Sequence, residues 1–385
     1  MPFYVKMGDI PNKRHTQFRK TDGSLYYEQV MGTKGFSGIH SLLYHHTPPT
    51  RVKSVTKIKD IQYEFEDRGP LKHRHFLTEN CPAGGDFLEA RKILLANEDI
   101  AIGIARPINK EMNYFYRNGE CDELLFVHEG SGKIESVFGE LSFRPGDYIV
   151  LPIGTTYRVM LQTPDARFLV VESRSAITTP RRYRNEHGQL LEHSPYCERD
   201  IRPPEKLEPH LEKGDFEVRV RAHGMLTAYR FDHHPLDAVG WDGYLYPYAF
   251  SIYDFEPITG RVHQPPPVHQ TFEGHNYVLC SFVPRMFDYH PQAIPAPYTH
   301  SNVDSDEVLY YVDGEFMSRK GIKEGSFTLH PSGLPHGPHP GKVEESIGQK
   351  ETAELAVMID TFRPLLVVKQ ALEWEDPAYM NSWYG

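Results

Sequence analysis

The 385-residue sequence has few cysteines and no long hydrophobic run. Its four cysteines lie far apart and form no CxxC pair, an arrangement typical of reduced thiols in the cytosol. The N-terminal segment MPFYVKMGDIPNKRHTQFRK lacks the apolar stretch of a secretion signal. No run of about 18 apolar residues predicts a membrane helix. We therefore expect a cytoplasmic protein without membrane contacts.

The sequence also lacks the excess of basic residues that nucleic-acid-binding proteins carry. Its formal net charge is −10 and its pI is near 6.1, which argues against nucleic acid or an anionic membrane as the main partner. What it has instead is 23 Tyr, 21 Phe, 31 Pro and 30 Gly. This composition favours many short strands joined by turns over long helices.

Strand-like runs of alternating apolar residues occur in two groups. The first group includes ELLFVHEGSGKIESV and GDYIVLP, and the second includes EVLYYVDGEF and GSFTLHP. Only ARKILLANED and LLVVKQALEW, near residue 90 and near the C-terminus, suggest helices. We predict an all-β protein with an N-terminal domain at 1–177, a proline-bearing linker at 178–215 and a C-terminal domain at 216–385.

The two groups share an internal repeat of turns. Six residues separate Glu307 from its turn glycine, and six separate Glu123 from the equivalent glycine. The segments GSFTLHPSGLPH and GDYIVLPIGTTY also share the spacing Gly-x5-Pro-x-Gly-x2, which ends on His336 in the second copy and on Tyr157 in the first. No histidine occurs in the dozen residues before Glu123. We therefore expect a metal-free first copy and a metal-binding second copy.

His300, Glu307 and His336 are the candidate metal ligands. Two histidines and one carboxylate form the set that holds non-haem Fe(II) and leaves coordination positions open. In a small barrel all three side chains can point inward. The simpler interpretation is a solvated glutamate at a strand end beside two loop histidines, and the internal repeat argues against it.

Four segments, THSNVDSDEVLYYVDG, LHPSGLPHGP, VGWDGYLYPY and YEQVMGTKGFSG, resemble homogentisate 1,2-dioxygenases over most of the chain. The resemblance implies two cupin-type, jelly-roll β-barrels, with Fe(II) held in the second by His300, Glu307 and His336. It also implies ring cleavage of a hydroquinone-type acid by O2. The most direct substrate is homogentisate, converted to maleylacetoacetate in tyrosine and phenylalanine degradation. Family members further suggest a homo-oligomer, a trimer or hexamer.

The resemblance assigns roles to other side chains. His330 matches a second active-site histidine and would orient or protonate the oxygen intermediate. Asp242 stands where the family usually has a histidine and would assist deprotonation of the phenol. The residues expected to contact the substrate are Tyr298, Phe316, Arg319 and His336. Phe316 replaces a family tyrosine, Arg319 replaces a lysine, and the His300–Glu307 spacing is one residue longer than in family members.

Three alternative functions stay open. The chain could cleave a related dihydroxyaromatic acid such as gentisate, it could be a zinc-dependent cupin sugar isomerase, or it could be a non-enzymatic bicupin with a structural metal. Another motif, HxHxxxE, contains His73, His75 and Glu79. It is the weaker metal candidate, because the turn-like NCPAGG follows it where a cupin has an apolar strand.

Overall fold

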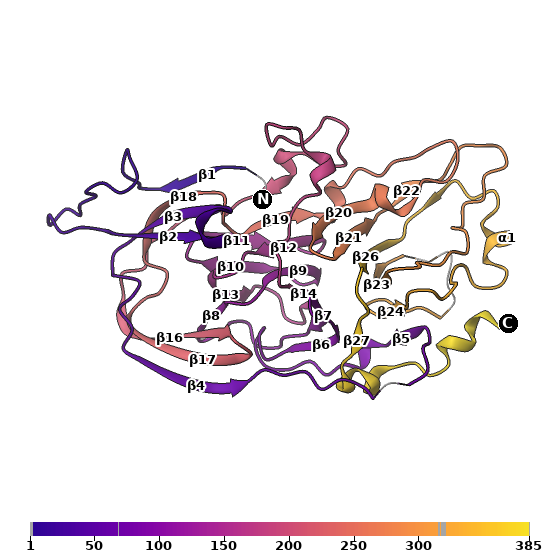
Figure 1. The fold of residues 1–385 in the computed structure, drawn as a ribbon, viewed down its shortest axis with the longest axis horizontal. Helices are drawn as coiled ribbons and strands as arrows, with labels where there is room; N and C mark the ends of the chain where they lie inside the picture. Colours follow the sequence, from indigo (N-terminus) through magenta and orange to yellow (C-terminus); the bar gives the residue numbers. More distant parts are fainter. Residues whose placement is uncertain (1–2, 68, 315, 317–320, 385) are drawn as a thin grey trace.

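The computed structural model describes residues 3–67, 69–314, 316 and 321–384. Within them the regular structure is almost entirely β, which confirms the predicted class. Two groups of strands lie side by side, with most indigo to magenta strands on the left of Figure 1 and most orange and yellow strands on the right. We call the left group the first barrel and the right group the second barrel.

Two sheets form the first barrel. The eight-stranded sheet contains, in spatial order, β15 (Ile201–Arg202), β19 (Tyr248–Ser251), β12 (Asp147–Leu151), β9 (Asp122–Glu129), β14 (Arg167–Ser173), β7 (Ile100–Ala105), β6 (Arg91–Ala96) and β27 (Leu366–Val367). The seven-stranded sheet contains β11 (Gly139–Phe143), β10 (Gly132–Ser136), β13 (Thr156–Leu161), β8 (Phe115–Asn118), β16 (Lys213–Ala222), β17 (Met225–His233) and β4 (Ser54–Asp60).

The second barrel is built on a six-stranded sheet, and smaller sheets complete the molecule. The six strands are β20 (Gln270–Gly274), β21 (Tyr277–Phe282), β26 (Leu355–Thr361), β23 (Asp306–Asp313), β24 (Phe327–His330) and β5 (Arg74–Phe76). A two-stranded sheet pairs β22 (Arg285–Met286) with β25 (Glu351–Thr352). A four-stranded sheet contains β1 (Val5–Gly8), β18 (Ala238–Gly243), β3 (His40–His45) and β2 (Tyr27–Gly32).

Helical structure in the described part of the chain is short. The helices are η1 (Lys34–Phe36), η2 (Thr78–Asn80), η3 (Arg181–Tyr183), η4 (Glu198–Asp200), η5 (Ile252–Asp254), η6 (Pro266–His269), α1 (Lys342–Ser346), η7 (Lys369–Trp374) and η8 (Tyr379–Trp383), where η marks a 3-10 helix. None of these helices has the length and apolar character needed to cross a membrane. The helix expected near residue 90 is instead strand β6, because its apolar side chains fill the barrel wall.

One hydrophobic core continues from barrel to barrel. The β9 sequence DELLFVHE is buried along almost its whole length, because one face lines the first barrel and the other meets the second. Tyr148 of β12 shows this contact: its ring lies 5.6 Å from that of Phe272, and its hydroxyl is 2.8 Å from the Ser281 hydroxyl. Such a shared apolar core fixes the relative position of the two barrels.

Strand pairing crosses the domain boundary expected at residue 216. β16 pairs in parallel with β8, and β19 pairs with β12, so residues 213–251 complete the first barrel. Conversely, β5 pairs with β24 and extends the second barrel (Figure 1). The linker expected at 178–215 contains η3, η4 and β15, and Thr178 forms an isolated bridge with Glu273.

Candidate metal centre

Glu307 is placed by the first residues of β23. The preceding residue, Asp306, accepts hydrogen bonds from the backbone N–H groups of Ser332 at 2.8 Å and Leu365 at 2.7 Å. Consecutive side chains of a strand point to opposite faces. With Asp306 held by these loops, Glu307 points to the other face, into the second barrel. Asp306 therefore serves the fold and is not an alternative metal ligand.

His300 and His336 come from two loops that pair with each other. Each donates its backbone N–H to the carbonyl of the other, at 2.9 and 2.8 Å, and their ring centroids lie 4.4 Å apart. Gly337 allows this approach, because a Cβ at that position would lie 2.7 Å from the Cα of Thr299. The loop pairing brings together two imidazoles that are far apart in sequence.

The three predicted ligands converge. His300 Nε2 lies 3.6 Å from Glu307 Oε2, and His336 Nε2 lies 3.3 Å from Glu307 Oε1. One potential ligand atom from each residue lies within 4.8 Å of the others. Burial alone would raise the pKa of Glu307, but its contacts with the surrounding histidines, including the hydrogen bond from His330, hold it well below its ordinary value. The carboxylate is therefore charged at neutral pH.

The Nδ1 atoms of the two histidines face backbone carbonyls. Nδ1 of His300 lies 3.2 Å from the carbonyl of Tyr298, and Nδ1 of His336 lies 3.2 Å from that of Leu334. A carbonyl only accepts, so both Nδ1 atoms carry the proton, and the Nε2 lone pairs face Glu307. His336 Nε2 is also buried and makes no hydrogen bond of good geometry. This donor set fits a divalent cation.

His330 lies behind Glu307 and does not line the cavity described next. It is fully buried, and its Nδ1 donates to Glu307 Oε1 at 2.8 Å. Its Nε2 lies 3.0 Å from the hydroxyl of Tyr379 in η8. Sequence reasoning expected His330 to act on an oxygen intermediate, whereas the geometry makes it a positioning residue that orients the carboxylate of Glu307.

A cavity of about 150 Å³ opens beside the cluster. Its wall includes Phe316, one of the predicted substrate contacts, which packs edge-on against Tyr311 with ring centroids 4.5 Å apart. The ring of Tyr298 lies 6.1 Å from that of His300 and is half exposed. Arg319, another predicted contact, lies outside the described residues.

Three further polar residues on the cavity wall, His263, His269 and Arg285, were missed by sequence reasoning. His263 stacks edge-on against Tyr298 at 4.9 Å, and burial lowers its pKa. Burial and the nearby Arg285 charge lower the pKa of His269 to about 3, so this ring is neutral. The two histidines flank the run QPPPV, and only this local pattern could have marked them.

Asp242, the predicted base, is not brought to the cluster within this chain. It lies in β18 of the four-stranded sheet, opposite Lys6 of β1 and Leu42 of β3. Its carboxylate accepts a hydrogen bond from the hydroxyl of Tyr4 at 2.8 Å. β18 is labelled on the left of Figure 1, whereas β23, which carries Glu307, is on the right. The prediction for Asp242 is corrected accordingly.

The HxHxxxE segment, which contains strand β5 and the start of η2, lies beside the cluster. His73 Nε2 donates to the carbonyl of Pro335 at 3.2 Å, and its ring centroid is 5.8 Å from that of His336. His75 Nδ1 lies 3.3 Å from a carboxylate oxygen of Asp376. Through these contacts His73 holds the loop that carries His336, and His75 holds the C-terminal segment.

Comparisons with known proteins point to one family. Residues 7–252 match the family model described as homogentisate 1,2-dioxygenase N-terminal, and this range ends one residue after strand β19. A Saccharolobus solfataricus protein whose dioxygenase assignment is provisional is 42% identical over 387 residues, covering 100% of both chains. Homogentisate 1,2-dioxygenase of Nitrobacter hamburgensis is 27% identical over 281 residues, covering 68% of this chain and 61% of that protein.

Solved structures similar to this chain include a cupin 2 conserved barrel domain protein from Leptotrichia buccalis. Its TM-score is 0.33 at 8% identity, covering 79% of this chain and 100% of that chain. An oxalate decarboxylase has a TM-score of 0.36 at 12% identity, covering 82% and 84%. The family model covers more than half of this sequence, and the S. solfataricus relative covers all of it. The chain therefore belongs to the homogentisate 1,2-dioxygenase family and has its bicupin fold.

Proposed function

We propose that this protein is an Fe(II)-dependent dioxygenase that cleaves the ring of a dihydroxyphenyl acid, with homogentisate as the preferred substrate. The observation that carries the proposal is the convergence of His300, Glu307 and His336, of which His300 and Glu307 line a small cavity. An Fe(II) ion held by these side chains would supply the redox chemistry that allows O2 to react with an aromatic ring.

The cavity favours a small aromatic acid. Its volume of about 150 Å³ is below the roughly 300–1,000 Å³ of sites for drug-sized ligands, which favours a single-ring molecule. Phe282, Met286 and Phe316 supply apolar wall, and Arg285 is the one Arg or Lys among the described residues that line it. Arg285 pairs with Glu354 at 2.8 Å, and its guanidinium is the group proposed to bind the substrate carboxylate.

His263 is the proposed base for the phenol proton. Burial lowers its pKa, so the imidazole is neutral near pH 7 and can accept a proton. It shares the cavity wall with His300 and Glu307. Holding the substrate between base and metal ligands places the reacting groups close together, which removes much of the entropic barrier.

Oxygen consumption tests the proposal. Metal-free protein is loaded anaerobically with Fe(II), and O2 uptake is measured with homogentisate, with gentisate and with 4-hydroxyphenylacetate, which lacks the second hydroxyl. We expect uptake with homogentisate, and none in His336→Ala, which lacks one of three ligands. Oxygen uptake with gentisate alone would make gentisate the substrate and would leave the proposed ring cleavage by O2 unchanged. Full iron occupancy without uptake on any dihydroxyphenyl acid would refute the proposal, and sugar isomerisation by Zn(II)-loaded protein without O2 would establish the isomerase.

A further inference from the structure

Strand register shows which residues of the first barrel correspond to the metal centre of the second. In the first barrel, Glu123 pairs with the last residue of β12 on one side and with Glu172 of β14 on the other. In the second barrel, Glu307 pairs with the last residue of β24 and with Asp360 of β26. Glu123 therefore occupies the place of Glu307, and Glu172 that of Asp360.

The two histidines have counterparts as well. Tyr116 lies seven residues before Glu123, as His300 lies seven residues before Glu307. Tyr116 pairs with Tyr157 across β8 and β13, and His300 forms the same antiparallel bridge with its own partner histidine. The rings of Tyr116 and Tyr157 meet edge to face with centroids 5.7 Å apart. The set Tyr116, Glu123 and Tyr157 thus repeats the metal-ligand positions with different side chains.

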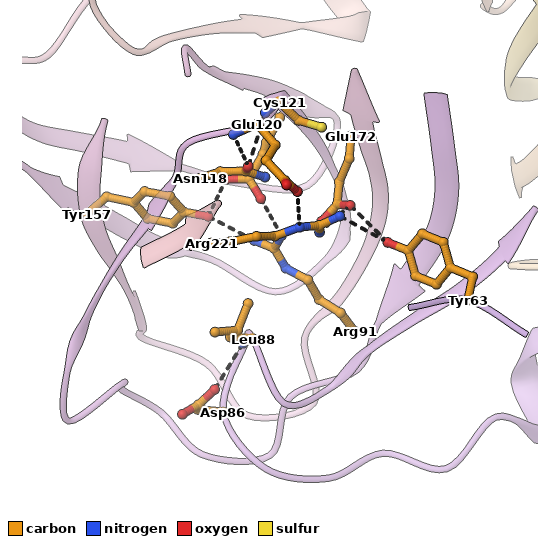
Figure 2. Close-up of polar contacts among 11 residues, drawn as sticks. Tyr63, Asp86, Leu88, Arg91, Asn118, Glu120, Cys121, Tyr157, Glu172 and Arg221 are labelled. Carbon is orange, nitrogen blue, oxygen red and sulfur yellow. Dashed lines mark hydrogen bonds and ion pairs between the residues drawn. The ribbon is translucent and has the colours of Figure 1, made fainter. Parts of the chain in front are cut away.

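A guanidinium lies at the centre of this set. Nη1 of Arg91 forms an ion pair with Glu123 and lies 3.2 Å from Glu172 Oε1. Its Nη2 donates to the Tyr157 hydroxyl at 2.8 Å, and that hydroxyl donates to Glu123 at 2.7 Å. The Cζ atom is 5.4 Å from the ring centroid of Tyr116. Figure 2 shows the Arg91 guanidinium between Tyr157 and Glu172.

A second arginine, Arg221, adds positive charge beside this set, and its Nε also pairs with Glu120 at 3.2 Å. Arg221 of β16 donates to Glu172 Oε2 at 2.6 Å and to the Tyr63 hydroxyl at 3.3 Å, on the side away from Tyr157 (Figure 2). Glu123 and Glu172 are almost completely buried and need compensating positive charge. Two guanidiniums therefore provide two positive charges in the first barrel, where the second barrel has ligands for one divalent cation.

We propose that the Arg91 guanidinium takes, in the first barrel, the place that a metal ion takes in the second, and that Tyr116, Glu123 and Tyr157 are a latent metal site that this side chain blocks. Both a divalent cation and a guanidinium satisfy a buried carboxylate, but the guanidinium arrives with the folding chain and cannot dissociate. On this proposal Arg91 keeps a metal ion out of this position, and the loss of histidines alone does not account for it. This inference concerns the first barrel and does not depend on the metal or substrate of the second.

Two variants separate the effect of Arg91 from that of the missing histidines. The double variant Tyr116→His/Tyr157→His restores the ligand types and keeps Arg91, and the triple variant adds Arg91→Ala. Metal-free full-length chains are titrated with Co(II), and bound metal per chain is counted after gel filtration. We expect the triple variant to bind one more Co(II) per chain than the double variant. Any metal in the second barrel contributes equally to both, so its failure to load would not hide the difference.

Two results would overturn the inference. One is a double variant that gains a Co(II) ion with Arg91 in place, and the other is a folded triple variant that gains none. Should the triple variant not fold, hydrogen exchange of the wild-type chain with and without a chelator decides. Protection of β9 and β14 is expected to stay within twofold, because their central cation is a side chain. A tenfold loss of protection in these strands on chelation would show that a dissociable metal holds the first barrel.

Discussion

At the scale of single residues, His330 offers the most direct test of how the metal cluster is held. It orients Glu307 through a buried hydrogen bond without contacting the cavity. Loss of such an outer contact typically weakens metal affinity about 10–100-fold. We expect that loss in His330→Phe, measured by competition with a coloured chelator at pH 7.5, with the partly exposed His233→Phe as control. Unchanged affinity in His330→Phe would remove His330 from the support of the site.

The choice of base is a second residue-scale prediction. His263 lines the cavity, whereas Asp242 bonds Tyr4 in another sheet. Loss of a general base costs about 10²–10⁴-fold in turnover. His263→Gln should therefore lower kcat by that factor with metal content intact, and Asp242→Asn should stay within about twofold. If Asp242→Asn lowers kcat in an oxygen-uptake assay and His263→Gln does not, the phenol proton goes to Asp242 and His263 is not the base.

At the scale of elements, β5 joins the second barrel to the C-terminal segment. Arg74 of β5 pairs with Glu66 at 2.6 Å and with Glu375 at 3.0 Å, and its side chain is 8% exposed. Removing one partner of a buried ion pair costs about 3–5 kcal/mol. Arg74→Gln should lose about this much free energy of unfolding in urea. Arg363→Gln breaks an exposed pair with Glu98 and should lose about 1 kcal/mol or less. Similar losses of unfolding free energy in both variants would mean that the contacts of Arg74 in β5 contribute little to stability.

At the scale of the whole molecule, buried neutral histidines set an acid limit on stability. Burial lowers the pKa of His128 to about 4 and that of His269 to about 3, from an ordinary value of 6.5. At pH values between the lowered pKa and 6.5, the unfolded chain binds more protons than the folded chain. The free energy of unfolding therefore falls as pH drops below 6.5 and is flat above it. His128 alone accounts for a loss of about 2 kcal/mol at pH 5.

Urea denaturation of the metal-free chain at pH 7.5 and pH 5 measures this loss. His128→Gln cannot take up the proton and should show a smaller difference between the two pH values than wild type. His187→Gln, an exposed substitution, should leave the difference unchanged. A wild-type free energy that rises on acidification would contradict the prediction.

The sequence predicted what local spacing encodes. The repeated Gly, Pro and Gly turns marked two related barrels, and the glutamates and histidines at fixed distances from them marked the metal cluster. Contacts between residues that are far apart in the sequence could not be predicted. Arg91 lies 32 residues before Glu123, and no local sequence pattern indicates that its guanidinium contacts that carboxylate. Asp242 was misplaced because a family position was transferred without its sheet, and β5 was overlooked because three residues carry too little periodicity.

Strand exchange between the barrels has a consequence for synthesis on the ribosome. The first barrel borrows its edge strand β27 from residues 366–367, and the second borrows β5 from residues 74–76. Because β5 and β6 are made first, each must wait for a partner strand that is synthesised more than 200 residues later. Until β24 and β27 have left the ribosome, the edges of β5 and β6 lack these partners and are open to other strands, a state that favours aggregation. The nascent protein must therefore remain partly folded until residues 366–367 have emerged, and its yield should depend on chaperones more than its final stability suggests.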